Sequence, residues 1–216
     1  MKFKGVIFDL DGTLVNSLED LADSMNIVLG KYDFPAHELQ VYKYFIGNGI
    51  RNLVREALPE THREEKTIAK CFDSMIEVYR NNCINKTKPY DGITQLLDGL
   101  VSRNMKLNVF SNKADELAKK IVLTLLPNWN FEVISGLTDE AHKKPDPIGA
   151  LLISKKIGIQ PENIIYVGDS GIDMQTANNA GMYAAGALWG FQTEEELISN
   201  GAEYLLKHPM DLFQIL

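Results

Sequence analysis

Four short apolar runs constrain the fold of this chain more than any other feature of its sequence. They read GVIF, LNVF, FEVIS and IIYVG, and they end just before Asp9, Ser111, Gly136 and Asp169. A short, continuously apolar run bounded by small or polar residues is typical of a strand buried on both faces of a parallel sheet. Since open α/β sheets bind ligands outside the carboxyl ends of their strands, the residues that follow these runs are candidates for a functional site.

Stretches with helical spacing lie between these runs. Apolar residues recur at this spacing from Ile93 to Leu100 and from Leu117 to Leu125. Alternating strands and helices are typical of the doubly wound, Rossmann-like α/β fold. We therefore expect a parallel sheet with helices packed against it.

One long segment breaks this alternation. From about Ser17 to Tyr79 the apolar residues keep helical spacing throughout. We therefore expect a discontinuous α/β core domain, residues 1–15 and 84–216, with an inserted α-helical cap domain at residues 16–83.

The start of this insertion carries a helix signal. Ser17, with Asp20 three residues later, is a candidate capping box for the first inserted helix. Because the insertion begins just after Asp9 and Asp11, we expect it to act as a lid over these two carboxylates.

Charge and hydropathy exclude several classes of partner. The 216 residues include 22 basic and 29 acidic ones, a net charge of -7, and form no concentrated basic patch, so nucleic acid is not an expected partner. Polar residues and glycines interrupt the uncharged stretch from Met174 to Thr193, which argues against a membrane span. The apolar run before Asp9 is too short for an export signal. With only two cysteines, Cys71 and Cys83, the chain is not expected to depend on disulfides, which favours a reducing compartment. Together these features predict a soluble, cytoplasmic protein.

Two carboxylates lie side by side in the FDLDGT segment at the end of the first run. At strand spacing, Asp9 and Asp11 project to one side while Leu10 points to the other. An acidic pair near a turn often does no more than cap a helix or face solvent. A calcium loop is excluded, because its sixth and twelfth positions counted from Asp9 require Gly and Glu but hold Leu14 and Asp20.

Three further segments carry side chains that suit a charged ligand. Ser111 and Asn112 offer a hydroxyl and an amide. Lys144 precedes a proline, which favours an extended backbone and a fixed ammonium group. Asp169 and Asp173 follow the last apolar run. A solvated lysine and a helix-start carboxylate are the plain alternatives for Lys144 and Asp173, but four such segments at successive strand ends indicate one site.

These residue types together suit the transfer of a phosphoryl group, which needs a nucleophile, a metal ion and neutralisation of the phosphate oxygens. We predict that Asp9 attacks phosphorus and that Asp11 serves first as acid and then as base. Mg²⁺ takes oxygen ligands and keeps several waters, so the carboxylates of Asp9 and Asp169 with the backbone carbonyl of Asp11 would suffice. Asp173 is expected to support the metal's waters or to orient Lys144.

The phosphate oxygens also need donors and a positive charge. Thr13, Ser111 and the loop amides that include Gly12 are expected to hold these oxygens. Lys144 would offset the negative charge that the carboxylates and the phosphate bring together. Without that cation the carboxylates would repel the substrate.

The chain resembles the haloacid dehalogenase-like phosphatases in four segments, which are FDLDGT, SN at residues 111 and 112, KKPDP and GDSGID. The inserted helices resemble the small α-helical cap of the subgroup that includes phosphoglycolate phosphatases. The resemblance implies a phosphatase with an aspartyl-phosphate intermediate on Asp9, with Asp11 as acid and base and with Mg²⁺ held at Asp9, Asp11 and Asp169. It also implies phosphate contacts from four residues, Thr13, Ser111, Asn112 and Lys144.

The FIGNGIRNLVREAL segment of the insertion resembles the cap segment of phosphoglycolate phosphatases. Gly47, Asn48 and Gly49 form a loop ahead of a predicted helix, whose amino-terminal amides would meet a small anion. Arg51 would pair with a substrate carboxylate, although a surface arginine is more often solvated. A dinucleotide fingerprint is excluded, because Asn52 stands where the third glycine belongs.

The expected substrate is a small phosphorylated metabolite such as 2-phosphoglycolate, since a small cap favours small substrates. A pyrophosphatase, sugar-phosphate phosphatase or phosphomutase of the same family is the alternative, because cap side chains decide the leaving group. Asn16 stands where many members of the resembled family have an acid. This difference is expected to affect substrate preference or the start of the first cap helix, and to leave the mechanism in place. A phospho-accepting signalling receiver has a similar constellation, but this chain adds a lid and a carboxylate pair suited to hydrolysis. Monomer and homodimer both remain open.

Overall fold

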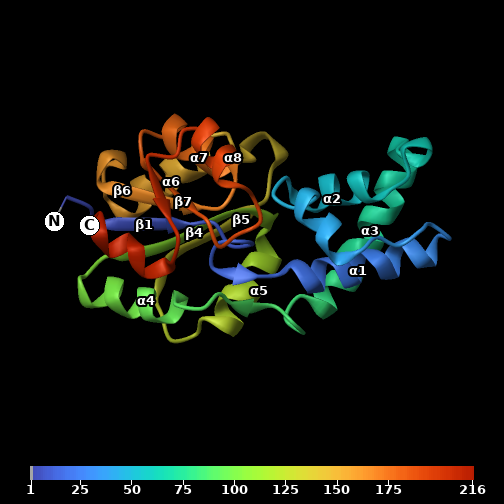
Figure 1. The fold of residues 1–216 in the computed structure, drawn as a ribbon, viewed down its shortest axis with the longest axis horizontal. Helices are drawn as coiled ribbons and strands as arrows, with labels where there is room; N and C mark the ends of the chain where they lie inside the picture. The colour runs from blue at the N-terminus through green and yellow to red at the C-terminus, as the bar shows by residue number, and fades with distance from the viewer. Residues whose placement is uncertain (1) are drawn as a thin grey trace. The chain divides into compact units, whose positions relative to one another are not determined.

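The computed structural model describes residues 2–216, which divide into two compact units (Figure 1). An α/β unit comprises residues 2–16 and Pro89–Leu216, and a helical unit comprises Ser17–Lys88. The chain passes between them through two short strands, β2 (Val15–Asn16) and β3 (Lys88–Pro89), which pair as a two-stranded sheet.

The α/β unit is built on a six-stranded sheet in which every neighbouring pair is parallel. In spatial order the strands are β5 (Phe131–Leu137), β4 (Lys106–Ala114), β1 (Gly5–Phe8), β6 (Ile164–Gly168), β7 (Tyr183–Ala187) and β8 (Tyr204–Leu206). The prediction of a doubly wound, Rossmann-like parallel sheet is confirmed. β1 lies near the middle, between β4 and β6, so the end of β1 faces residues from both neighbours.

Helices lie on both sides of this sheet (Figure 1). One side carries α4 (Ile93–Ser102) and α5 (Asp115–Leu125), and the other carries α6 (Ile148–Ile157) and α7 (Gly171–Asn179). Successive strand residues point to opposite faces, so Ile7 of β1 packs with Ile153 of α6 and Met174 of α7 in one core. The remaining helices of this unit are α8 (Glu194–Ser199), η3 (Glu140–His142), η4 (Pro161–Asn163) and η5 (Pro209–Gln214).

Strand β4 continues four residues beyond the apolar run that predicted it. The run ends at Phe110, but the strand reaches Ala114. Its pairing with β5 is irregular between Phe110 and Ala114. Ser111 and Asn112 therefore belong to the last, irregular part of the strand and do not follow it, because the polar residues continue the extended backbone.

The helical unit packs three α-helices around its own core. α1 (Leu18–Lys31) and α2 (Gly49–Ala57) both contact α3 (Glu65–Asn82). Short 3₁₀ turns, η1 (Leu39–Tyr44) and η2 (Glu60–His62), connect these helices. Apolar side chains at helical spacing are buried in all three, including Met25, Leu53 and Met75. Both cysteines are buried thiols. No helix in the described part of the chain is long and apolar enough to cross a membrane.

The predicted capping box at the start of α1 is wrong in its bonding. Ser17 does stand at the N-cap of α1, but its side chain makes no capping hydrogen bond. The buried carboxylate of Asp20 instead accepts hydrogen bonds from the backbone amides of Lys86 and Thr87 and from the Thr87 hydroxyl, at 2.6–3.0 Å. This set of hydrogen bonds, the Asp20 clasp, fixes residues 86 and 87 to α1. The helical unit accordingly ends at Lys88, five residues later than the expected boundary at 83.

Replacing Asp20 with asparagine is expected to lower the free energy of unfolding by roughly 3 kcal/mol. The two backbone amides and the Thr87 hydroxyl now donate to a buried carboxylate, and the N–H groups of an asparagine amide would face some of these donors without an acceptor. Urea unfolding followed by circular dichroism measures this loss. Asp23→Asn is the matched control. It removes an exposed ion pair with Lys86 and should cost less than about 1 kcal/mol. Equal losses in the two variants would contradict the assignment of this clasp.

Candidate active site

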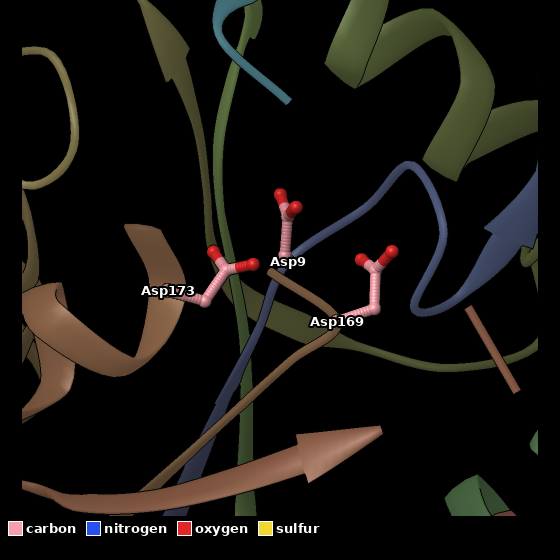
Figure 2. A group of neighbouring side chains, drawn as sticks. All are labelled: Asp9, Asp169 and Asp173. Atoms are coloured by element: carbon pink, nitrogen blue, oxygen red, sulfur yellow. The ribbon is translucent and has the colours of Figure 1, made fainter. Parts of the chain in front are cut away.

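Three buried carboxylates meet at the carboxyl edge of the sheet (Figure 2). Asp9 follows β1, Asp169 follows β6, and Asp173 lies in the first turn of α7. One carboxylate oxygen from each lies within 4.8 Å of the others. They converge because β1 and β6 are neighbours, and the Asp9 amide still donates to the Val167 carbonyl at 2.9 Å.

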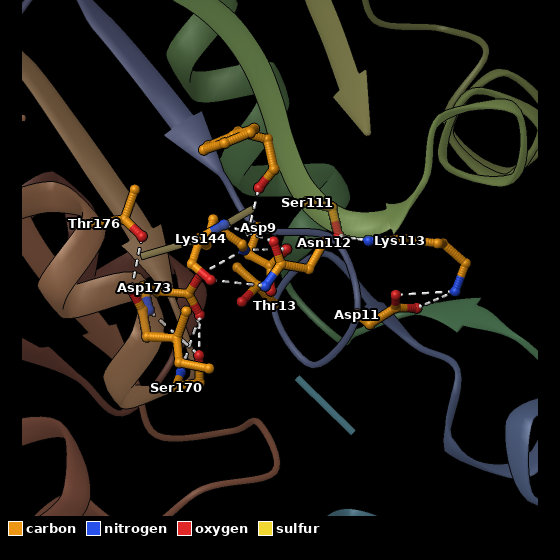
Figure 3. A network of polar contacts seen from close by, with 12 residues as sticks. Asp9, Asp11, Thr13, Ser111, Asn112, Lys113, Lys144, Ser170, Asp173 and Thr176 are labelled. Carbon is orange, nitrogen blue, oxygen red and sulfur yellow. Dashed lines mark hydrogen bonds and ion pairs between the residues drawn. The ribbon is translucent and has the colours of Figure 1, made fainter. Parts of the chain in front are cut away.

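The Lys144 ammonium group lies among these carboxylates. Its Nζ is 2.9 Å from Asp9 Oδ1 and 2.6 Å from Asp173 Oδ1, and it donates to the Phe110 carbonyl at 3.3 Å (Figure 3). The side chain of Asn112 forms two hydrogen bonds with the Lys144 backbone. It accepts one from the Lys144 amide at 2.8 Å and donates one to the Lys144 carbonyl at 3.3 Å. The lysine side chain is only 2% exposed. These contacts, together with its burial, fix the position of its charge.

Burial makes the charges of this site costly. It raises the pKa of Asp9 from 3.8 to about 6, although the nearby Lys144 ammonium opposes the rise. Burial, with the Asp173 and Asp9 charges, also holds the pKa of Asp169 well above its usual range. For Lys144, burial alone would lower the pKa, but Asp173 and Asp9 outweigh it and hold the pKa above its ordinary value. Lys144 is therefore a permanent cation, and the carboxylates are short of positive charge.

The residues present fit a divalent cation. If Asp9, Asp169 and Asp173 are all ionised, their charge exceeds that of Lys144 by two negative units, which one divalent ion balances. Asp9 Oδ1 is buried and, among the described residues, faces Lys144 as an ion pair but accepts no well-aligned hydrogen bond. Carboxylate oxygens are the ligands preferred by hard cations such as Mg²⁺. A metal ion would thus balance the excess negative charge and give Asp9 Oδ1 a second positive partner beside Lys144.

Asp169 is held on two sides by polar contacts. Its Oδ1 accepts from the Thr13 hydroxyl at 2.9 Å, and its Oδ2 accepts from the Phe191 amide at 2.9 Å. The indole N–H of Trp189 donates to the Thr13 carbonyl at 2.9 Å, which ties the loop after β7 to the loop after β1. The Thr13 hydroxyl proton is therefore committed to Asp169, and the phosphate contact expected of Thr13 stays a prediction.

Two glycines allow the backbone to close around the Asp169 carboxylate. Gly12 has a φ of 85°, and a Cβ there would lie 2.1 Å from Asp169 Oδ2. A Cβ on Gly190 would lie 2.2 Å from the Asp169 Cβ atom. Neither position has room for a side chain while Asp169 keeps its place.

Asp173 both caps the start of α7 and contacts Lys144, two roles that the sequence analysis treated as alternatives. Its Oδ2 accepts from the Ser170 amide and hydroxyl, at 3.1 and 2.6 Å, which completes a capping box at the start of α7. Its Oδ1 accepts from Lys144. The helix-start carboxylate is also the group that orients the lysine.

Asp11 does not join the three-carboxylate group. Its two carboxylate oxygens accept hydrogen bonds from Lys113 Nζ at 2.8 and 2.9 Å (Figure 3). The group of carboxylates that could hold a metal comprises Asp9, Asp169 and Asp173. Metal binding by Asp11 through its backbone carbonyl therefore stays a prediction, and its side chain is engaged by a cation that sequence reasoning did not single out.

The remaining predicted residues divide between the two units. Ser111 is buried at the end of β4, and its hydroxyl accepts from the Lys113 amide at 3.3 Å. The loop of Gly47, Asn48 and Gly49 precedes α2 in the helical unit, where Asn48 is the N-cap. Arg51 pairs with Glu65 of the same unit. Substrate contacts from this loop and from Arg51 remain predictions.

Sequence reasoning missed several residues around the site, chiefly Lys113, Trp189, Phe191 and Tyr90. Burial, with the Asp169 and Asp11 charges, raises the pKa of Tyr90, so its hydroxyl stays protonated. The sequence could have indicated Lys113, because residues two apart on an extended strand point to the same side and Ser111 was already a candidate. Trp189 and Phe191 had no local signal, because they reach the site only through the position of β7.

Comparison with known proteins identifies related chains over almost the whole length. The family model described as "Haloacid dehalogenase-like hydrolase" matches residues 6–187. The phosphoglycolate phosphatase of Aquifex aeolicus is 33% identical over 215 residues, which cover 98% of this chain and 95% of that protein. An N-acetylmuramic acid 6-phosphate phosphatase of Pseudomonas aeruginosa is 25% identical, and the match covers 100% of this chain and 96% of that protein.

Solved structures share the same fold. A crystal structure from Lactobacillus delbrueckii subsp. bulgaricus, provisionally assigned as a phosphoglycolate phosphatase, superimposes with a TM-score of 0.93 at 27% sequence identity. The superposition covers 100% of this chain and 98% of that chain.

Proposed function

Because this chain belongs to the haloacid dehalogenase-like hydrolase family, we propose that it is a Mg²⁺-dependent phosphatase that hydrolyses a small organic phosphate monoester through a phosphorylated Asp9. The observation that carries the proposal is the meeting of Asp9, Asp169 and Asp173 with the fixed ammonium group of Lys144. A nucleophilic carboxylate, metal ligands and a cation are the parts that phosphoryl transfer requires.

The first step forms the covalent intermediate. A carboxylate oxygen of Asp9 attacks phosphorus, and the bond from phosphorus to the ester oxygen breaks. Asp11 must carry a proton in this step, so one of its oxygens gives up the hydrogen bond that it accepts from Lys113. Asp11 passes that proton to the departing alkoxide, and an alcohol leaves. Lys144 stays beside Asp9 as an ammonium group and offsets the charge of the incoming phosphate.

The second step returns the enzyme to its starting state. Water attacks phosphorus, Asp11 takes up a proton from it, and the bond between Asp9 and phosphorus breaks to release inorganic phosphate. The same carboxyl group therefore acts in both directions. Asp11 suits this dual role because it stands two residues from Asp9 and its carboxylate lies outside the group of carboxylates that could hold the metal.

Mg²⁺ would be held by the carboxylates of Asp9 and Asp169 and by the backbone carbonyl of Asp11, with Asp173 in support. When bound, the ion supplies positive charge that stabilises the phosphate oxygens during transfer. Thr13, Trp189 and Phe191 hold Asp169 in place for this purpose. Ser111 donates its hydroxyl to the phosphate. The predicted phosphate contact of the Gly12 amide is not available, because this amide donates to the Val15 carbonyl at 2.9 Å.

The helical unit would act as a cap that selects the leaving group. Relatives of similar length include a phosphoglycolate phosphatase and an N-acetylmuramic acid 6-phosphate phosphatase, so fold and mechanism do not decide the substrate. We favour 2-phosphoglycolate, whose carboxylate Arg51 would pair with and whose small size suits the loop of Gly47, Asn48 and Gly49.

A panel of phosphate esters tests this function. Release of inorganic phosphate would be measured for two- and three-carbon phosphates, sugar phosphates, nucleotides and pyrophosphate, each with Mg²⁺ and with a chelator. We expect many turnovers per chain, loss of turnover on chelation, and the highest kcat/KM for 2-phosphoglycolate. Capture of a single phosphoryl group per chain without turnover would instead identify a signalling receiver, and turnover unaffected by chelation would contradict the metal assignment.

A further inference from the structure

The ion pair between Asp11 and Lys113 lies beside the site, and the proposed mechanism does not use it. Lys113 Nζ reaches both oxygens of Asp11, at 2.8 and 2.9 Å. The lysine side chain is 2% exposed and the aspartate side chain 13% exposed. Burying a lysine here removes its ammonium group from water, which costs free energy. An ion pair on the surface does not carry this cost, because its charged groups stay hydrated.

The two partners lie in different backbone elements. Asp11 lies in the turn after β1, next to Gly12, whose positive φ marks a tight reversal of the chain. Lys113 lies in β4, and the neighbouring strand packs so closely on it that a Cβ on Gly136 would be 2.6 Å from its carbonyl oxygen. The Lys113 amide is also bound to the Ser111 hydroxyl. Lys113 therefore reaches the loop carboxylate from a neighbouring strand whose backbone is closely packed.

We propose that Lys113 is a positioning residue for the reaction, which holds the Asp11 carboxylate in the place from which it exchanges protons with the leaving group and with water. This inference rests on the proposed function, because it assigns Asp11 the acid and base roles described above. Lys113 itself touches neither the ester nor phosphorus in this scheme. It acts through Asp11, as Asn112 acts through Lys144.

The dependence on the leaving group separates this role from a structural one. The value of kcat/KM reports the steps up to departure of the alcohol. A poor leaving group such as an alkoxide needs the proton from Asp11, whereas p-nitrophenolate leaves without one. A misplaced Asp11 should therefore slow alkyl phosphates selectively, while general damage to the site should slow both kinds of ester.

The test is a double-mutant cycle on the full-length chain with Mg²⁺. We expect Lys113→Met to lower kcat/KM for an alkyl phosphate by about 10²-fold and to change kcat/KM for p-nitrophenyl phosphate by less than about threefold. Asp11→Asn should show the same selectivity. In the Asp11→Asn background, Lys113→Met should cause almost no further loss, because its effect passes through Asp11.

Two more variants guard against a folding defect. Asp11→Asn combined with Lys113→Met removes both partners and leaves no unpaired charge, so it should fold even if Lys113→Met is unstable. Lys113→Arg keeps the charge and should restore most of the activity toward alkyl phosphates. Lys119→Met, which breaks an exposed ion pair with Asp115 on α5, is the matched control and should leave both activities unchanged.

Three results would overturn the inference while the proposed function stands. These are equal losses for alkyl and aryl phosphates in Lys113→Met, losses that multiply in the double variant, and full activity of Lys113→Met toward alkyl phosphates. Failure of the proposed function would look different, since the wild-type chain would then hydrolyse neither ester.

Discussion

Replacing Asp9 with asparagine should lower the turnover of every phosphate ester by at least about 10³-fold, because an amide oxygen is too weak a nucleophile to displace an alkoxide from phosphorus. Asparagine has nearly the same shape as aspartate, so the packing around Lys144 and Asp173 should persist. Initial rates with Mg²⁺ and a saturating substrate measure the loss.

The stability of Asp9→Asn should not fall with its activity. Because the pKa of Asp9 is raised from 3.8 to about 6, the ionised carboxylate opposes folding fully above about pH 6. This cost shrinks as pH falls below 6 and is gone below 3.8. A neutral amide escapes the cost, and we expect the variant to melt at or above the wild-type temperature at neutral pH. Asp23→Asn, an exposed position in the helical unit, should retain full activity. Turnover by Asp9→Asn within about tenfold of wild type would refute the nucleophile assignment.

Replacing Lys144 with methionine should have the second-largest effect, a loss of about 10²–10³-fold in kcat/KM. The substitution removes the only cation that the described residues place within ion-pair distance of Asp9 and Asp173. Breaking a buried pair also leaves uncompensated charge, so unfolding free energy should fall by roughly 3 kcal/mol or more. Steady-state kinetics and urea unfolding of the same preparations measure the two losses.

A second substitution separates these two losses. Adding Asp173→Asn to Lys144→Met removes one of the stranded carboxylates and should recover part of the stability. It should recover none of the activity, because the phosphate still lacks its cation. If activity returned together with stability, Lys144 would be a structural residue and its catalytic role would be wrong.

The sequence predicted the parts of the fold that depend on local pattern. β1 and β6 coincide with the runs GVIF and IIYVG because these strands are buried on both faces and therefore wholly apolar. β7, which reads YAAGA, escaped notice, since alanine and glycine have little preference for strands and owe their conformation to neighbouring β6. Ser17 marked the start of α1, but the partner of Asp20 lies far along the chain and could not be read from spacing.

The site divides in the same way. The rule that ligands bind at the carboxyl ends of parallel strands singled out Asp9, Lys144 and Asp169, which the structure brings together. The pairing of Asp11 with Lys113 was not predicted, because it depends on the direction in which two side chains leave their backbones. The contact of Trp189 with the Thr13 carbonyl depends on the course of a whole loop.

The central claim is that Asp9 carries the phosphoryl group during turnover, and the Asp11→Asn variant offers the most direct measurement of it. With p-nitrophenyl phosphate and Mg²⁺, the first step needs no acid, while hydrolysis of the intermediate lacks its base, so phosphorylated enzyme should accumulate. After an acid quench and proteolysis, mass spectrometry should locate one phosphoryl group on Asp9. A burst of p-nitrophenol with the phosphoryl group on another residue, or with none on the protein, would contradict the account.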